Sequence, residues 1–315
     1  MNDQPPGETL DHSKRWLFEP MTGEDTYAHA ITRVLADQQT EHQHMRIVES
    51  ATYGTALVLD GQWQSSTGDE FIYHEAMVHA AACAHGAPRS VLILGGAEGA
   101  TAREALKWPT VERIVTCDID RQVIDACRQH MPEMAGGAFE DPRHELVVGD
   151  AFGFIDRAAD GNDRFDLIIS DLSDPIEDGP SWRLFTRETF AQCKRALTAE
   201  GIFIIQAGGI APAEVGLHAR VSITLASVFT NVSSLQVPVP IFGTPLGMLI
   251  ASDSPIDRLP DVDATDTILE PITDRRFIDG RTLLGLYQVP LYVRKALAQE
   301  GRVFTLDDPP RFGSD

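Results

Sequence analysis

The stretch VLILGGAEGATAREALK, residues 91–107, decides the fold. Its first four residues are apolar and have the length and composition of a buried β-strand. Glycines at positions 95, 96 and 99 then permit a sharp turn, because a residue without a Cβ atom turns tightly and lets a ligand approach the backbone. Residues 101–107 continue as a helix. We therefore expect a strand, a glycine-rich turn and a helix, which together form one unit of an α/β sheet.

The chain repeats this rhythm as far as residue 206. The expected strands are residues 91–94, 114–117, 146–148, 165–169 and 202–206, and the expected helices are 101–107, 122–130 and 187–196. Strict alternation predicts parallel strands joined by right-handed crossovers, hence a doubly wound α/β sheet. Because ligands of such sheets bind beyond the carboxyl ends of the strands, the functional residues are expected there.

A different pattern precedes this sheet. Residues 45–50 and 55–60 are short β-type runs, and Asp60-Gly61 is a strong hairpin signal before Trp63. Apolar spacing becomes helical from 73 to 84. The first residues are rich in proline, glycine and charge and are expected to form a flexible tail. The predicted organisation is a tail at 1–13, an antiparallel β-domain at 14–75 and an α/β domain at 76–315.

Acidic residues follow the first three expected strands. Glu98 lies in the glycine-rich turn, Asp118 follows the second strand and Asp150 the third. The turn does not fit the GxGxxG dinucleotide pattern, since Ala97 and Ala100 stand where glycines are needed and Glu98 would repel a pyrophosphate. An acidic residue after the second strand typically binds ribose hydroxyls, and Asp150 can accept a hydrogen bond from an adenine amino group. Each aspartate alone can equally cap a helix. The series favours an adenosine ligand without phosphates.

Two aspartates three residues apart, Asp171 and Asp174, follow the fourth expected strand. A carboxylate pair placed next to a nucleoside suits a cationic amine that must be held and deprotonated. The alternative is a structural turn, with an aspartate capping a helix and Pro175 stiffening the loop. Because both aspartates are present, the pair favours the reactive end of a site.

Charge and cysteine content narrow the range of partners. The chain has 26 Lys and Arg against 47 Asp and Glu, a net charge of −21, which disfavours nucleic acid and anionic membranes and attracts cationic small molecules. An acidic surface can also serve solubility alone. The four cysteines form no CxxC pair, which predicts buried, reduced thiols and no zinc site. The N-terminus is polar and no apolar run has the length of a membrane span, so we expect a cytoplasmic protein.

Taken together, these motifs resemble the polyamine aminopropyltransferases, the spermidine and spermine synthases, and most closely their thermospermine synthase-like branch. The resemblance runs in order from about residue 16 to residue 304. The matching segments are LDGQWQ at 59–64, DEFIYHE at 69–75, VH at 78–79, GGAEG at 95–99, TARE at 101–104, CDID at 117–120, GD at 149–150, DLSDP at 171–175, GP at 179–180, LFT at 184–186 and GIFIIQAG at 201–208.

The resemblance implies a small N-terminal antiparallel β-domain followed by a Rossmann-like, methyltransferase-type doubly wound sheet. It implies a homodimer or homotetramer with no metal or redox cofactor. The implied reaction transfers an aminopropyl group from decarboxylated S-adenosylmethionine to an amine and releases methylthioadenosine. By motif position, Asp171 is the general base, and Tyr73 and Asp174 position the acceptor amine. The implied cosubstrate residues are Gln43, Gln64, His74, Gly95, Glu98, Asp118, Ile119, Asp150 and Ala151.

Three positions depart from the family pattern. Ala97 replaces a common glycine and adds a methyl group near the expected sulfonium, and His42 replaces a tyrosine that often precedes Gln43. Residues 207–209 are Ala-Gly-Gly, where spermidine synthases carry Glu-Ser and a nearby tryptophan. The departures leave the acceptor open among putrescine, agmatine, cadaverine, spermidine and longer amines. Spermidine, giving thermospermine or spermine, is the acceptor that the branch resemblance implies, with putrescine to spermidine as the other reaction.

Two further functions are compatible with the same sheet. One is an S-adenosylmethionine-dependent methyltransferase, and the other is a noncatalytic binder of polyamines or nucleosides. Glu98 with Asp171 and Asp174 would form an acidic chamber that disfavours the amino-acid carboxylate of ordinary S-adenosylmethionine. The presence of both aspartates disfavours a noncatalytic binder.

Overall fold

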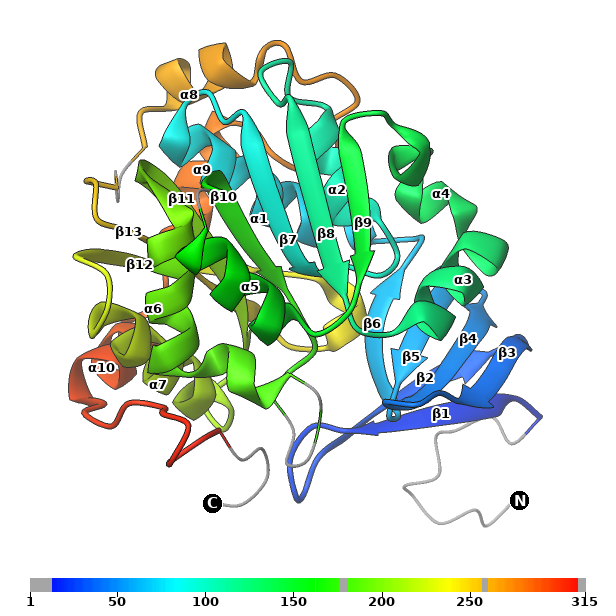
Figure 1. The fold of residues 1–315 in the computed structure, drawn as a ribbon. Coiled ribbons are helices and arrows are strands. Elements are labelled where there is room, and N and C mark those ends of the chain that lie inside the picture. Colours follow the sequence, from blue (N-terminus) through cyan, green and yellow to red (C-terminus); the bar gives the residue numbers. More distant parts are fainter. Residues whose placement is uncertain (1–12, 162, 176–178, 180, 257–259, 311–315) are drawn as a thin grey trace.

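The computed structural model describes residues 13–161, 163–175, 179, 181–256 and 260–310 (Figure 1). The expected tail therefore lies outside the described residues except for Ser13, and so does residue 180 of the GP segment. Antiparallel strands form the N-terminal part of the molecule, and a large sheet with helices on both faces forms the rest.

The large sheet has seven strands in the order β12-β13-β11-β10-β7-β8-β9. Its strands are β7 (Ser90–Gly95), β8 (Arg113–Asp118), β9 (His144–Val148), β10 (Phe165–Asp171), β11 (Leu197–Gly209), β12 (Asn231–Val237) and β13 (Leu246–Ser252). The pairs among β7, β8, β9, β10 and β11 are parallel, which confirms the predicted doubly wound sheet. Strand β13 is antiparallel to both β11 and β12, because the short connection at 238–245 cannot form a crossover. The sequence had not revealed β12 and β13.

Helices cover both faces of this sheet (Figure 1). They are α1 (Glu70–His85), α2 (Ala100–Leu106), α3 (Arg121–His130), α4 (Pro132–Ala135), α5 (Ala151–Asp160), α6 (Arg187–Ala196), α7 (Val215–Ala226), α8 (Val262–Leu269), α9 (Gly280–Leu286) and α10 (Leu291–Gln299), with 3₁₀ helices at Ala138–Glu140, Trp182–Phe185 and Pro240–Phe242. Alternate residues of β7 enter different cores: Val91 and Ile93 pack with α1 and α2, whereas Leu92 and Leu94 pack with α5, α6 and α7. Burial on both faces explains why the strand is a continuous apolar run.

Strand β7 lies at the centre of the five parallel strands, where the strand order reverses between β8 and β10. Its last residue, Gly95, pairs with Asp171 at the end of β10. Gly95 has φ +81°, and a Cβ atom there would lie 2.0 Å from the Asp171 carbonyl oxygen, so glycine is required. The reversal opens a crevice beyond these two strand ends, which is where sheets of this type bind ligands.

The N-terminal part contains two small sheets. Strands β1 (Arg15–Pro20) and β2 (Thr26–Ile31) form one, and β3 (Arg33–Gln39), β4 (His44–Ser50), β5 (Gly54–Leu59) and β6 (Gln62–Ser66) form the other. The turn between β5 and β6 has positive φ at both Asp60 (48°) and Gly61 (84°), which confirms the predicted hairpin. Helix α1 begins at Glu70 and crosses residue 75, where we placed the domain boundary.

The four cysteines are free thiols; three are buried and Cys83 is partly exposed. Within the described residues, no helix is long and apolar enough to cross a membrane.

Candidate active site

A cavity of about 1300 Å³ lies between the carboxyl ends of the central strands and the N-terminal strands. It is larger than a typical pocket for one small molecule, so it has room for two ligands. The sequence-predicted site residues that line it are Gln43, Gln64, Tyr73, Gly95, Glu98, Asp118, Ile119, Asp150, Ala151, Asp171 and Asp174. The fold thus brings together residues spread over more than one hundred positions of the chain.

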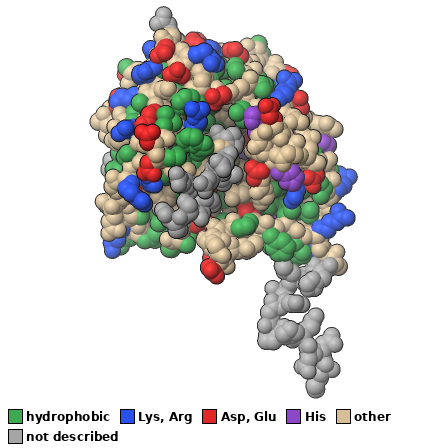
Figure 2. All heavy atoms as spheres, turned by 60° about the horizontal axis from the view of Figure 1, so that its bottom comes forward, with side chains coloured by type: hydrophobic (Ala, Val, Ile, Leu, Met, Phe, Trp, Pro, Cys, Tyr) green, Lys and Arg blue, Asp and Glu red, His purple; other side chains and the backbone are tan. Residues whose placement is uncertain are grey.

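The surface charge does not collect in one place on the face shown in Figure 2. Acidic and basic side chains are interspersed among hydrophobic ones in the described part of that face. Asp118, Asp171 and Asp174 in the cavity differ from these surface groups because they are withdrawn from water, and their environments decide their chemistry.

Asp118 lies at the end of β8 and caps no helix. One of its oxygens accepts the backbone N–H of Asp120 at 2.8 Å. Asp120 is instead the N-cap of α3, and its second oxygen accepts hydrogen bonds from Thr40 (2.6 Å) and Gln43 (3.2 Å), which ties the N-terminal strands to the sheet. Burial, aided by the nearby charge of Glu98, raises the pKa of Asp118 to about 7.

Asp150 combines a helix cap with a place in the cavity wall. Its side chain caps α5 by accepting the N–H of Phe152 at 3.0 Å, and it also lines the cavity beside Ala151. A helix cap at a strand end therefore does not exclude a ligand contact, because the carboxylate has acceptor positions left over.

Asp171 lies at the carboxyl end of β10 with both carboxylate oxygens hydrogen-bonded. The Tyr73 hydroxyl donates to Oδ1 at 2.8 Å, and the Thr101 hydroxyl donates to Oδ2 at 2.5 Å. Burial and the charge of Glu98 raise the pKa of Asp171, outweighing His74 and the two hydroxyls, which lower it. Thr101 was not among the predicted residues, although its place in the first turn after the glycine loop aims it at the neighbouring strand end.

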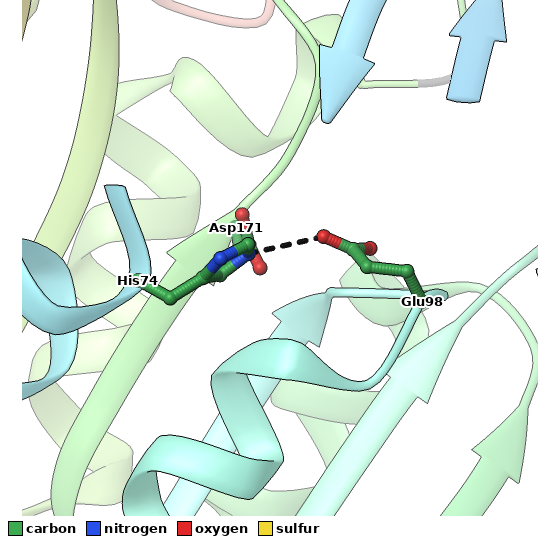
Figure 3. Close-up of side chains that lie close together, drawn as sticks. All are labelled: His74, Glu98 and Asp171. Carbon is green, nitrogen blue, oxygen red and sulfur yellow. Dashed lines mark hydrogen bonds and ion pairs between the residues drawn. The ribbon is translucent and has the colours of Figure 1, made fainter. Parts of the chain in front are cut away.

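His74 is not among the residues that line this cavity, and its contact with the cosubstrate stays a prediction. Its ring is buried between two carboxylates: Nδ1 lies 2.9 Å from Glu70 Oε2, and Nε2 lies 3.1 Å from Glu98 Oε1. Figure 3 shows His74, Glu98 and Asp171 pointing toward one another from α1, the β7–α2 loop and the end of β10. His74 therefore acts on the cavity through Glu98, which it holds in place.

His74, Glu98 and Asp171 also offer three possible metal-ligand atoms within 4.8 Å of one another. Burial lowers the pKa of His74, but its contacts with Glu70 and Glu98 outweigh burial and raise it to about 10. Both ring nitrogens then carry protons at neutral pH and have no lone pair for a metal. The donor set fits an ion-pair chain better than a metal centre.

The ion-pair chain continues behind the cavity. Arg103 of α2 donates to Glu70 (2.7 Å), to Glu104 (3.0 Å) and to the Met134 carbonyl (2.7 Å). Glu104 also contacts His79 (3.2 Å) and Lys107 (2.8 Å). The TARE motif thus makes two kinds of contact. The Thr101 hydroxyl binds Asp171, and Arg103 binds Glu70, which in turn contacts His74.

Asp174, which follows β10, is held in the cavity wall by Gln206 of β11. The Gln206 amide donates to Asp174 Oδ1 at 2.8 Å and to the Leu172 carbonyl at 2.7 Å. Burial raises the pKa of Asp174, Gln206 lowers it, and the charge of Glu214 raises it further, so the net shift is upward. The sequence showed a departure from the family pattern at residues 207–209, next to Gln206, but did not single out Gln206 or Glu214.

Family models match two adjacent parts of the chain. A model described as the spermine/spermidine synthase domain matches residues 70–257, and one described as the spermidine synthase tetramerisation domain matches residues 16–66.

Full-length relatives are similar across nearly the whole chain. A polyamine aminopropyltransferase of Synechococcus sp. (strain JA-2-3B'a(2-13)) is 49% identical over 305 residues, covering 94% of this chain and 97% of the relative. One from Aeropyrum pernix is 40% identical over 297 residues, covering 93% and 94%.

Solved structures share the fold. A spermidine synthase in complex with the transition-state analogue AdoDATO superposes with a TM-score of 0.83 at 27% identity, covering 95% of this chain and 99% of that one. The spermidine synthase of Thermotoga maritima superposes with a TM-score of 0.82, also at 27% identity, covering 93% and 98%.

Proposed function

We propose, from the premise that this chain belongs to the spermine/spermidine synthase family, that its two substrates meet in the cavity beyond β7, β8 and β10. The chain is an enzyme of the aminopropyltransferase type, which transfers an aminopropyl group from decarboxylated S-adenosylmethionine to a polyamine acceptor and releases methylthioadenosine. The observation that carries the proposal is Asp171, a carboxylate with a raised pKa that Tyr73 and Thr101 fix inside the cavity.

The acceptor must lose a proton before its nitrogen can attack. A primary amine with a pKa near 10.4 is neutral in only about one molecule in a few thousand at pH 7, and freeing it costs roughly 4 to 5 kcal/mol. A base near the attacking nitrogen removes most of this barrier, and general bases of this kind contribute about 10² to 10⁴ in rate.

We assign the base to Asp171. Each of its oxygens accepts one hydroxyl hydrogen bond and keeps a further lone pair for the incoming amine. Its raised pKa brings its proton affinity closer to that of the amine. As the nitrogen bonds to the methylene carbon next to sulfur, that carbon–sulfur bond breaks, its electron pair stays on sulfur as a neutral thioether, and the amine proton passes to Asp171. Asp174 and Tyr73 orient the nitrogen for this displacement.

We assign the choice of cosubstrate to Glu98. His74 occupies Glu98 Oε1, which leaves Oε2 for the ammonium of the aminopropyl arm. The same carboxylate repels the amino-acid carboxylate of ordinary S-adenosylmethionine, so it favours the decarboxylated form. We assign Asp118 to the ribose hydroxyls and Asp150 with Ala151 to the adenine, while Gln43, Gln64, Gly95 and Ile119 complete this wall of the cavity.

We propose spermidine as the acceptor and a homodimer or homotetramer as the assembly. The match of residues 16–66 to a tetramerisation domain supports an oligomer built through the N-terminal strands. Small molecules, and not nucleic acid or membranes, are the proposed partners.

The test is release of methylthioadenosine from decarboxylated S-adenosylmethionine with a panel of amines, with products separated by chromatography that resolves spermine from thermospermine. We expect turnover with spermidine and a much weaker affinity for ordinary S-adenosylmethionine in direct titration. No nucleoside release with any amine, or equal affinity for the two cosubstrates, contradicts the proposal.

A further inference from the structure

Two acidic side chains at the acceptor end of the cavity remain without a role. Glu19 of β1 and Glu214 at the N-terminus of α7 both line the cavity, and neither belongs to the motifs found in the sequence. Besides burial, the charges of Asp174 and Glu214 raise the pKa of Glu19, to about 7. Glu19, Glu214 and Asp174 line the same cavity, where their like charges repel one another.

Glu19 has an unsatisfied oxygen. The residue is 7% exposed, and its Oε1 accepts the backbone N–H of Trp63 at 3.2 Å. Among the described residues, its Oε2 and the indole Nε1 of Trp63 find no hydrogen-bond partner. A buried polar atom without a partner is costly, so an orphaned carboxylate oxygen in a cavity wall indicates a donor supplied by a ligand.

Glu214 occupies space that Gly209 leaves open at the end of β11. A Cβ atom on Gly209 would lie 2.7 Å from Glu214 Oε2, and one on Gly208 would lie 3.7 Å from Asp174 Oδ2. Among the described residues no ion pair involves Glu214, whereas Arg220 and Arg302, which line the same cavity, pair with Asp308 and Glu300. The carboxylate therefore reaches the cavity wall because residue 209 has no side chain.

We propose that Glu214, together with Glu19, binds the protonated nitrogens of the acceptor that lie beyond the attacking one, and thereby selects a triamine over a diamine. This inference rests on the proposed function. Asp171 and Asp174 are assigned to the attacking nitrogen, which leaves two carboxylates for further cations. A triamine such as spermidine has two nitrogens beyond the attacking one, whereas a diamine such as putrescine has one.

The experiment compares steady-state kinetics of the wild-type chain and Glu214→Gln with spermidine and with putrescine at saturating cosubstrate. Loss of one charge-assisted contact is expected to lower the spermidine-to-putrescine ratio of kcat/KM at least about tenfold, mainly through a higher KM for spermidine. The KM for decarboxylated S-adenosylmethionine is expected to stay within about twofold, because Glu214 lies at the opposite end of the cavity from Asp118 and Asp150.

A second variant moves the carboxylate without removing its charge. In Gly209→Ala the new Cβ atom displaces the end of the Glu214 side chain, so the same ratio is expected to fall about as far. Gly285→Ala, whose Cβ would meet nothing within 4 Å, and the exposed Glu200→Gln are the matched controls and should keep the wild-type ratio.

The outcomes separate this inference from the proposed function. If the wild-type chain releases no methylthioadenosine with any amine, the proposed function fails. If it does release the nucleoside, but prefers putrescine or keeps its preference in both Glu214→Gln and Gly209→Ala, the role of Glu214 is overturned while the reaction stands.

Discussion

Buried acidic side chains occur in two neighbouring regions of this molecule, behind the cavity and inside it, and their pKa values shift in opposite directions. Behind the cavity, Glu70 and Glu104 face Arg103, Lys107 and buried histidines. Burial alone would raise their pKa values, but these partners outweigh it and lower both, that of Glu104 to about 2. Their charges are already neutralised, so these carboxylates support the structure.

Inside the cavity the balance is reversed. The pKa values of Asp118, Asp171 and Asp174 are all raised, and burial is the largest cause each time. Hydrogen bonds to these groups come from neutral hydroxyls, an amide and a backbone N–H, which do not offset the loss of water. We infer from this difference that the cavity carboxylates are arranged to bind a cation that the protein itself does not supply.

The largest expected effect concerns Asp171, the proposed base in the cavity. Asp171→Asn keeps the shape and one of the two hydroxyl hydrogen bonds, because its amide nitrogen donates and cannot accept, and it cannot take a proton from the amine. Turnover is expected to fall by about 10² or more, while the affinity for methylthioadenosine changes by less than about threefold. Single-turnover kinetics and titration measure the two quantities, with the exposed Asp263→Asn as control. Unchanged turnover would remove Asp171 from the role of base.

The next largest effect concerns the ion pairs behind the cavity. Arg103→Met leaves Glu70 and Glu104 without their shared cation, and removing one partner of a buried pair costs about 3 to 5 kcal/mol of unfolding free energy. Arg121→Met removes an exposed pair with Asp125 and should change the unfolding free energy by less than about 1 kcal/mol. Denaturant unfolding measures both.

In the same measurement, Asp118→Asn is expected to leave the unfolding free energy at pH 8 unchanged or higher, because it removes a charge that burial disfavours. If Arg103→Met and Asp118→Asn destabilise equally, the distinction between the two regions is wrong.

The sequence predicted the sheet and most of the cavity because both depend on local patterns. Apolar runs ending in glycine or aspartate fix where strands stop, and parallel strands bring their ends to one edge. Asp118 and Asp171 could therefore be found from their positions alone, and family resemblance added Tyr73 and Gln43.

Other residues could not be found, because their roles depend on contacts between distant elements. Thr101 of α2 and Gln206 of β11 matter because they contact Asp171 and Asp174, which lie at and beyond the end of a different strand. The contact between His74 and Glu98 likewise joins two elements far apart in the sequence. Strand β13 lacks the crossover helix that marks parallel strands in a sequence. Glu214 depends on a glycine five residues earlier.

A smaller effect concerns pH. The unfolded chain releases the Asp118 proton near pH 4, whereas the folded chain holds it to a pKa of about 7, so this group's contribution to stability falls as the pH rises from about 4 to 7. A cationic ligand favours the ionised form. The affinity for decarboxylated S-adenosylmethionine should therefore rise up to about tenfold per pH unit below 7 and level off above it.

Calorimetric titration from pH 5.5 to 8.5 checks this rise. The neutral methylthioadenosine should show a shallower slope than the cationic cosubstrate, and Asp118→Asn should flatten the slope for both. Equal slopes for the two ligands in the wild-type chain would mean that the cavity carboxylates do not respond to the ligand's charge.

The smallest effect separates orientation from proton affinity at Asp171. The Thr101 hydroxyl stabilises the charged carboxylate, so Thr101→Val should raise the pKa of Asp171 further. Because the base acts only when ionised, the acid limb of the pH–turnover profile should move up by about one unit, with a few-fold loss at pH 7 that largely recovers at pH 9. Thr267→Val, on an exposed helical surface, is the control. A loss of the same size at every pH would instead show that Thr101 only orients the carboxylate, and that the raised proton affinity of the cavity does not limit the rate.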